Sequence, residues 1–142
     1  VLVLSMPEPA PVALIGELLA TQAVAQGVAG MLVDASVRDV EELVELGLPI
    51  WARWVRVRGA TKETVGEIGA PVTVGGQRIE TGDAVVLDAD GAVVVAAPDL
   101  DATLDAARER DHREALKRVQ LRDGALSYDL DGLRERVEGG AR

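Results

Sequence analysis

Two short stretches of the sequence place charged side chains where they could act together. The first is Gly16-Glu17-Leu18-Leu19; the twenty residues 18–37 separate its Glu17 from the second, Arg38-Asp39, and Glu42 follows one helical turn later. If each stretch begins a helix, two sets of free N–H groups and two positive dipole ends would converge, which suits a carboxylate ligand. Arg38 adds a fixed cation, and the acids add oxygen ligands for a divalent metal. The pattern indicates metal-assisted chemistry on an organic acid.

The same residues have structural explanations that the spacing leaves open. An acid in the first turn of a helix, as expected for Glu17 and Asp39, is commonly a partner of the helix dipole. Arg38 could pair with an acid at the surface, and such pairs contribute little to stability. A metal site and a set of surface contacts therefore both fit these residues.

The elements that would position the first stretch are a strand and a helix. We expect a strand over Val1–Ser5, a turn containing three prolines, and a helix from about Leu14 to Gln26 that stops at Gly27. Five residues would form the inner face of this helix: Leu14, Leu18, Leu19, Ala23 and Val24.

A buried strand and a second helix would position the second stretch. Gly30–Val33 is an apolar run ending in Asp34, which is typical of a strand in a parallel sheet. Ser36 is the expected N-cap of the next helix, Asp39 lies in its first turn, and Gly47 ends it. Its inner face would consist of Val40, Leu43 and Val44. This βαβα alternation predicts an α/β fold.

The second half of the sequence predicts strands followed by a helix. An extended segment over residues 50–58 would carry a row of arginines on one face, Arg53, Arg56 and Arg58. Two hairpins should turn at Gly75-Gly76 and Asp90-Gly91. A helix from Leu100 to about Arg122 is expected to break or bend near Asp111-His112 and to turn four residues inward: Leu104, Ala107, Leu116 and Val119. A short segment over residues 130–137 follows, and residues 139–142 should fray.

Composition narrows the classes of function. The chain has 142 residues, 48% of them hydrophobic, which suits a single domain over residues 1–142. A formal net charge of −9 opposes binding to nucleic acid or to an anionic membrane. No apolar stretch reaches the ~20 residues of a membrane span, and no signal-peptide pattern is present. Because Cys is absent, thiolate nucleophiles and thiolate zinc sites are excluded, and a reducing cytoplasm is the expected location.

Longer runs of the sequence resemble one known superfamily. Gly16–Thr21, Gly27–Asp39 and Leu48–Arg53 are similar to the 4-hydroxy-4-methyl-2-oxoglutarate aldolases and regulator of ribonuclease activity A, the RraA-like proteins. Later runs resemble the β-meander of that superfamily: Pro71-Val72, Gly75-Gly76, Gly82-Asp83, Asp88 and Asp90–Val95. An acid, twenty residues and Arg-Asp is typical of the aldolase branch, because the ribonuclease-regulator branch typically lacks the acid that is Glu17 here.

The resemblance implies a fold and an assembly. The fold would be α/β, with a mixed, partly barrel-like β-sheet of the swivelling β/β/α type flanked by helices. Homo-oligomers, trimers or hexamers, would carry active sites between subunits. The chain would correspond to the C-terminal two thirds of the usual family length and would lack an N-terminal segment of helices and strands. Its start at Val1, inside an expected strand, also indicates a piece of a longer protein.

The resemblance also implies an activity. A class II aldolase of this kind cleaves a 4-hydroxy-2-oxo di- or tricarboxylate to pyruvate and a second oxo acid, and it decarboxylates oxaloacetate as a side activity. The substrate would be of the 4-hydroxy-4-methyl-2-oxoglutarate or 4-carboxy-4-hydroxy-2-oxoadipate type. The cofactor would be Mg²⁺ or Mn²⁺, which acts as a Lewis acid on the substrate's pyruvyl moiety.

The residue roles follow from the same resemblance. Asp39 would bind the metal directly, and Arg38 would hydrogen-bond the keto oxygen and stabilise the enolate. Glu17 would position a water of the metal's hydration shell that takes the proton of the C4 hydroxyl. Gly16, Leu18 and Leu19 would line the substrate site, the two leucines through their N–H groups. Glu114 of a neighbouring subunit would also hold waters of the metal.

Some features depart from the superfamily or fit other sites poorly. Asp34-Ala35 stands where the superfamily usually has Asp-Gly, so a turn that requires a left-handed backbone could differ. His112, the only histidine, is expected to be a solvated surface residue rather than a catalytic base. Gly27–Gly30 lies between a helix and a strand, whereas a dinucleotide fingerprint follows a strand and opens a helix. The row of arginines could attract polycarboxylates, or it could be a solvated strand face.

Two rival functions stay open. One is a non-catalytic protein of the ribonuclease-regulator type that docks on a ribonuclease or helicase, and Glu17 argues against it. The other is a degenerate subunit that serves assembly only.

Overall fold

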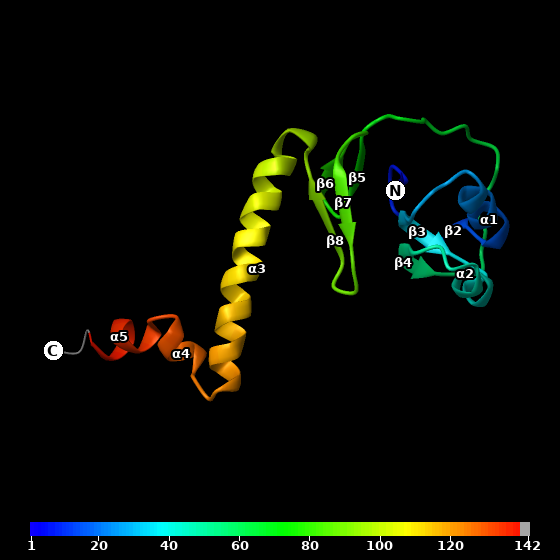
Figure 1. The fold of residues 1–142 in the computed structure, drawn as a ribbon. Coiled ribbons are helices and arrows are strands. Elements are labelled where there is room, and N and C mark those ends of the chain that lie inside the picture. Colours follow the sequence, from blue (N-terminus) through cyan, green and yellow to red (C-terminus); the bar gives the residue numbers. More distant parts are fainter. Residues whose placement is uncertain (140–142) are drawn as a thin grey trace. The chain divides into compact units, whose positions relative to one another are not determined.

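The computed structural model describes residues 1–139, which fall into two compact units, Val1–Ala97 and the residues from Pro98 onward (Figure 1). The fraying predicted for residues 139–142 lies, beyond Gly139, outside the described residues. The first unit holds a four-stranded sheet, two helices and two hairpins. The single-domain assignment over residues 1–142 stays a prediction.

The sheet of the first unit is built around one central strand, β3 (Met31–Val37). β1 (Leu2–Leu4) and β2 (Ala13–Ile15) pair in parallel with successive parts of β3, and β4 (Ile50–Val55) pairs in parallel with its other edge. Every residue of β3 is buried, as is typical of a parallel strand covered on both faces. The α/β prediction with a parallel sheet is confirmed.

Both helices of this unit cover the same face of β3. Four alternate residues of the strand, Met31, Val33, Ala35 and Val37, share a core with α1 (Glu17–Ala25) and α2 (Val40–Leu46). The inner face predicted for the first helix is wrong at Leu18, Leu19 and Val24, whose side chains are exposed. Ala20 and Ala23 face the sheet instead, because small side chains let the helix lie close to it.

The boundaries of two elements differ from the sequence-based expectation. Leu14 and Ile15, predicted as the beginning of the helix, lie in β2 instead, because pairing with β3 overrides a weak local preference. β3 continues past Asp34 to Val37, so the predicted N-cap Ser36 lies inside the strand and caps nothing. Asp39 takes the N-cap position of α2, with a left-handed φ of 59°, and Gly47 ends that helix as predicted. In α2 only Leu43 is buried, so Val40 and Val44 were wrongly placed on the inner face.

Two antiparallel hairpins follow the sheet, as predicted. β5 (Val72–Val74) pairs with β6 (Gln77–Ile79), and β7 (Ala84–Leu87) pairs with β8 (Ala92–Val95). Among the described residues, these hairpins pair separately from the parallel sheet. The partly barrel-like closure of one mixed sheet therefore stays a prediction.

The predicted row of arginines does not form. β4 ends at Val55, so Arg56 and Arg58 lie beyond the strand and cannot share its face with Arg53. Arg53 reaches a buried acid on the neighbouring strand, Asp34. All three arginines are nevertheless exposed, as expected for solvated side chains.

The second unit is mostly one long helix, α3 (Leu100–Arg122), at the predicted bounds. The helix is not broken near Asp111-His112, because it is continuous there, and ion pairs four residues apart, Arg110–Glu114 and Glu109–Arg113, support it. None of its residues is buried in the described chain, so the inward face was wrong as well. A short 3₁₀ helix, η1 (Ala97–Asp99), precedes α3. The predicted closing segment forms two short helices after α3, α4 (Ser127–Leu130) and α5 (Leu133–Glu138).

The helices of both units are too short or too polar to be membrane spans. Within residues 1–139, none combines the length and the apolar character needed to cross a bilayer.

Candidate functional site

The carboxyl ends of β2 and β3 meet at one edge of the sheet. Ile15 pairs with Val37 in parallel register, and the Arg38 N–H donates to the Ile15 carbonyl at 3.0 Å. Each strand leads directly into a helix, so the residues that follow the two strands lie side by side. This edge is where α/β sheets place their ligand sites, and both predicted stretches of charged residues lie at it.

Three of the predicted site residues are in contact at this edge. The backbone N–H of Glu17, at the start of α1, donates to Oδ2 of Asp39 at 3.1 Å. Nε of Arg38 lies 3.7 Å from the same oxygen. Asp39 is the only non-glycine residue with a positive φ among the described residues, a conformation that Asp tolerates better than most residues. Strained backbone of this kind is concentrated at functional sites.

Gly16 makes this close approach possible. A β-carbon at position 16 would lie 2.5 Å from Oδ2 of Asp39 and 3.0 Å from Nε of Arg38. Real β-carbons are not found so close to another atom, so a side chain at position 16 would displace the Asp39 carboxylate and the Arg38 side chain from their present positions. Gly16 therefore belongs to the site through its lack of a side chain.

The Glu17 side chain points into an acidic hollow. Oε1 of Glu17 accepts a hydrogen bond from the Thr21 hydroxyl at 3.0 Å, one helical turn away. A hollow of about 490 Å³ beside it is lined by Glu17, Asp39, Glu42, Glu45 and Leu46. Glu42 was noted in the sequence as a possible member of the site. Glu45, three residues later on the same helix, was missed, although this spacing could have indicated it.

Leu18 and Leu19 offer backbone groups rather than side chains. The first hydrogen bond within α1 runs from Ala20 N–H to the Gly16 carbonyl at 3.1 Å, so the N–H groups of Leu18 and Leu19 precede the helical ladder. The Leu18 side chain is 80% exposed. The two N–H groups at the positive end of the helix suit an anionic ligand.

Glu114, the acid predicted to act from a neighbouring subunit, lies on α3. Its Oε1 accepts a hydrogen bond from Nε of Arg110 at 2.7 Å. This hydrogen bond and the charge of Arg110 lower the pKa of Glu114, which keeps the carboxylate ionised at neutral pH. His112, on the same helix, is exposed as predicted.

The residues around Asp39 suit a hydrated divalent ion better than a caged one. Within residues 1–139, no three Asp, Glu or His side chains gather closely enough to enclose a metal together. Mg²⁺ usually keeps several waters and is held by one or two carboxylates. Oδ1 of Asp39 takes no hydrogen bond among the described residues, and the acids of the hollow supply further oxygen donors. The donor set is therefore chemically compatible with Mg²⁺ or Mn²⁺.

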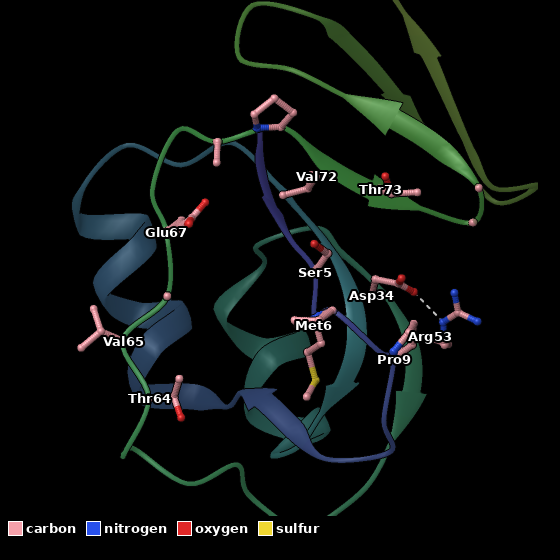
Figure 2. Close-up of a pocket in the computed structure, with 16 residues that line it drawn as sticks. Ser5, Met6, Pro9, Asp34, Arg53, Thr64, Val65, Glu67, Val72 and Thr73 are labelled. Atoms are coloured by element: carbon pink, nitrogen blue, oxygen red, sulfur yellow. Dashed lines mark hydrogen bonds and ion pairs between the residues drawn. The ribbon is translucent and has the colours of Figure 1, made fainter.

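A larger hollow lies on the face of β3 that α1 and α2 do not cover, and none of the residues around Asp39 lines it (Figure 2). Its volume is about 840 Å³, and it lies between the segment after β1, the residues before β5 and the hairpin of β5 and β6. Arg53 donates from Nε to Oδ1 of Asp34 at 2.5 Å at its edge. Asp34 is 4% exposed. Asp34 and Arg53 pair with each other there, and although Glu67 also lines this hollow, none of its lining residues begins a helix.

Gly59 is a second residue of the site that the sequence did not indicate. A β-carbon there would lie 3.2 Å from Nη1 of Arg38. The residue follows β4 in an irregular segment, and its contact with Arg38 depends on how that segment returns to the sheet.

The chain is similar to proteins of one family along most of its length. The sequence profile described as "RraA-like: Aldolase/RraA" matches residues 1–94. A protein of Halalkalibacterium halodurans named "Putative 4-hydroxy-4-methyl-2-oxoglutarate aldolase" is 29% identical over 126 residues, which cover 89% of this chain and 58% of that protein. A protein of the same name from Xanthomonas campestris is 40% identical over 86 residues, which cover 61% of this chain and 52% of that protein.

A solved structure shares the fold. The Streptomyces coelicolor protein RraAS2, described as an unusual member of the RNase ES inhibitor RraA protein family, superposes with a TM-score of 0.76 at 31% identity. The match covers 83% of this chain and 61% of that one. The chain thus spans little more than half the length of the relatives it matches. By the profile match over more than half of its residues, the chain belongs to the RraA-like family.

Proposed function

We propose that this chain forms the pyruvate-handling part of a divalent-metal-dependent aldolase, a carbon–carbon lyase. The names of its relatives support this class of enzyme. The observation that carries the proposal is the meeting of Glu17, Arg38 and Asp39 at the carboxyl edge of two parallel strands. The proposed substrates are 4-hydroxy-2-oxo di- or tricarboxylates such as 4-hydroxy-4-methyl-2-oxoglutarate, with oxaloacetate decarboxylation as a side activity.

The proposed reaction breaks the bond between C3 and C4 of the substrate. The proton of the C4 hydroxyl leaves to a water held by Glu17, C4 becomes a carbonyl, and the bonding electrons pass to the pyruvyl fragment. Negative charge then develops on the keto oxygen at C2, where the Arg38 guanidinium stabilises it. Protonation of C3 completes pyruvate. Mg²⁺ or Mn²⁺ at Asp39 would supply Lewis-acid polarisation of the same oxygen.

The remaining residues would orient the substrate. The N–H groups of Leu18 and Leu19 bind its carboxylate at the positive end of α1. The Thr21 hydroxyl holds the Glu17 carboxylate toward the hollow. Gly16 leaves room for the Asp39 carboxylate and the Arg38 side chain at the start of α1. Because these groups are fixed before substrate arrives, they lower the entropic part of the barrier.

We further propose a homo-oligomer, a trimer or hexamer, in which Glu114 of one subunit serves the site of the next. Its lowered pKa supports this role, because a carboxylate must be ionised to hold a hydrated cation. A partly barrel-like closure of the strands would belong to the same assembly.

The direct test is pyruvate release from 4-hydroxy-4-methyl-2-oxoglutarate, coupled to lactate dehydrogenase. We expect turnover with Mg²⁺ or Mn²⁺, none after treatment with EDTA, and recovery when the metal is restored. Asp39→Ala should be inactive with metal present. Turnover that EDTA and Asp39→Ala leave undiminished would refute the proposal.

The likeness to RraAS2 favours a second candidate, a non-catalytic regulator that binds a ribonuclease or helicase. Glu17 and its acidic hollow argue against this candidate. Calorimetry with Mg²⁺ and Mn²⁺ separates the two functions. Absence of metal binding together with capture of purified RNase ES would support the regulator.

A further inference from the structure

We propose that Gly59 is a positioning residue: its lack of a side chain determines where the Arg38 guanidinium lies. The catalytic consequence rests on the proposed aldolase function, in which Arg38 stabilises charge on the keto oxygen. The geometric claim can be tested without it.

The backbone at Gly59 is attached to the same strand that leads into the site. After β4 the chain returns to β2, where the Ala13 N–H donates to the Arg58 carbonyl at 2.7 Å and the Ala60 N–H donates to the Ala13 carbonyl at 3.1 Å. Gly59 lies between these two hydrogen bonds, as the parallel bridge partner of Ala13. The main chain of Gly59 is therefore held in register with β2 at Ala13, and Ala13 lies three residues before Gly16 in the sequence.

The Arg38 side chain lies against both glycines. A β-carbon at Gly59 would lie 3.2 Å from Nη1 and 3.9 Å from Cζ of Arg38, and one at Gly16 would lie 3.0 Å from Nε. The Arg38 side chain is 49% exposed. A half-exposed arginine ordinarily samples many rotamers, so contact with two glycine positions restricts where its head group can lie.

A methyl group at Gly59 would move the guanidinium without unfolding the protein. Gly59 has no positive φ, so alanine fits the backbone there. The nearest atom is the far end of a flexible side chain, which can give way by a few tenths of an ångström. The expected effect is thus confined to the position of Arg38. Small displacements of a group that acts on the transition state reduce the rate strongly.

Gly66 provides a matched control in the same unit. A β-carbon there meets nothing within 4 Å, and its φ is also not positive. Gly66→Ala therefore makes the same chemical change in open space. A difference between the two variants in the Arg38 resonance or in kcat is therefore due to the contact between position 59 and the Arg38 side chain.

The experiment compares Gly59→Ala, Gly66→Ala and the unchanged 142-residue chain. The Nε–H resonance of Arg38 in ¹⁵N NMR spectra, assigned by its loss in Arg38→Lys, reads the guanidinium directly. We expect it to shift in Gly59→Ala and to stay in place in Gly66→Ala, with equal urea midpoints for all three. In pyruvate release, Gly59→Ala should lower kcat about tenfold with KM changed less than twofold, because Arg38 acts mainly in the transition state.

Kinetics of a double variant complete the test. Added to Arg38→Ala, the Gly59→Ala change should cause no further loss, because the group that it displaces is gone. An unmoved Arg38 resonance, a loss of folding, or kcat equal to that of Gly66→Ala would each overturn the proposal. If the unchanged chain releases no pyruvate with metal, the proposed function fails, and the NMR comparison still decides whether Gly59 positions Arg38.

Discussion

Asp39 caps a helix to which it does not belong: its Oδ2 accepts the N–H of Glu17, the first residue of α1, at 3.1 Å. The residue before that helix, Gly16, has no side chain to do so. Asp39 also begins α2 with a left-handed backbone. One residue thus links the starts of both helices, and the candidate site depends on its carboxylate for geometry as well as for charge.

Substitutions at Asp39 should separate these two roles. Asparagine keeps an acceptor oxygen and tolerates the left-handed conformation. The free energy of unfolding of Asp39→Asn should therefore lie within about 0.5 kcal/mol of that of the unchanged protein. Alanine loses the cap, about 1 kcal/mol, and adds about 1 kcal/mol of backbone strain. Urea denaturation measures both. Pyruvate release should be lost in both variants, because a neutral side chain binds Mg²⁺ poorly.

The two measurements can contradict the account separately. Equal destabilisation by asparagine and alanine would mean that the capping contact is not stabilising. Metal-dependent turnover by Asp39→Asn would mean that the carboxylate is not the metal ligand.

Thr21 should influence activity through Glu17. Thr21→Val removes the hydroxyl that donates to Oε1 of Glu17. Without this hydrogen bond, the Glu17 carboxylate can rotate out of the hollow. We expect pyruvate release to fall about threefold to tenfold. The free energy of unfolding should change by less than about 0.5 kcal/mol, because the hydrogen bond is exposed to solvent. Thr21→Ser retains the hydroxyl and should restore the rate; equal loss in both variants would indicate that the hydrogen bond is irrelevant.

The Asp34–Arg53 pair should contribute to stability rather than to catalysis. Arg53→Met removes the partner of the Asp34 carboxylate, which is 5% exposed. We expect the free energy of unfolding, measured by urea denaturation, to fall by about 2 kcal/mol. The loss is smaller than for a fully buried pair, because the Arg53 side chain is itself 38% exposed. Arg56→Met is the control: within residues 1–139 the Arg56 side chain donates only to the carbonyl of Val55, and its loss should change the free energy of unfolding by less than about 0.5 kcal/mol. Equal effects of the two substitutions would show that the ion pair adds nothing.

Helix α3 should depend on pH through Glu114. Its hydrogen bond to Arg110 lowers the pKa of Glu114 in the folded protein. The stabilising contribution is therefore complete above the unfolded-state pKa and is lost as the pH falls through the lowered folded-state pKa, which lies below the usual range of a glutamate. Amide exchange of residues 110–114, corrected for intrinsic rates, should lose protection over the same fall in pH. Glu114→Gln should show no such step; a step of equal size in that variant would assign it to another group.

Local chemistry explains which elements could be predicted. The hairpins at Gly75-Gly76 and Asp90-Gly91 require residues that accept turn conformations, and the α3 pattern is long enough to define its own ends. β2 has no such signal: Ala13–Ile15 is compatible with a helix, and only pairing with β3 makes it a strand. The polar residues Asp34 and Ser36 suggested the end of β3, yet strands on both edges carry it through to Val37.

The sequence by itself determined that an acid, an arginine and an aspartate stand at the beginnings of two helices, because apolar periodicity and turn residues act over a few neighbouring positions. The tertiary structure alone decided that these beginnings touch. Parallel pairing of β2 with β3 places Gly16 against Arg38 and Asp39, and the return of the chain after β4 adds Gly59. Contacts between distant residues depend on strand order and register, which no short stretch of sequence encodes.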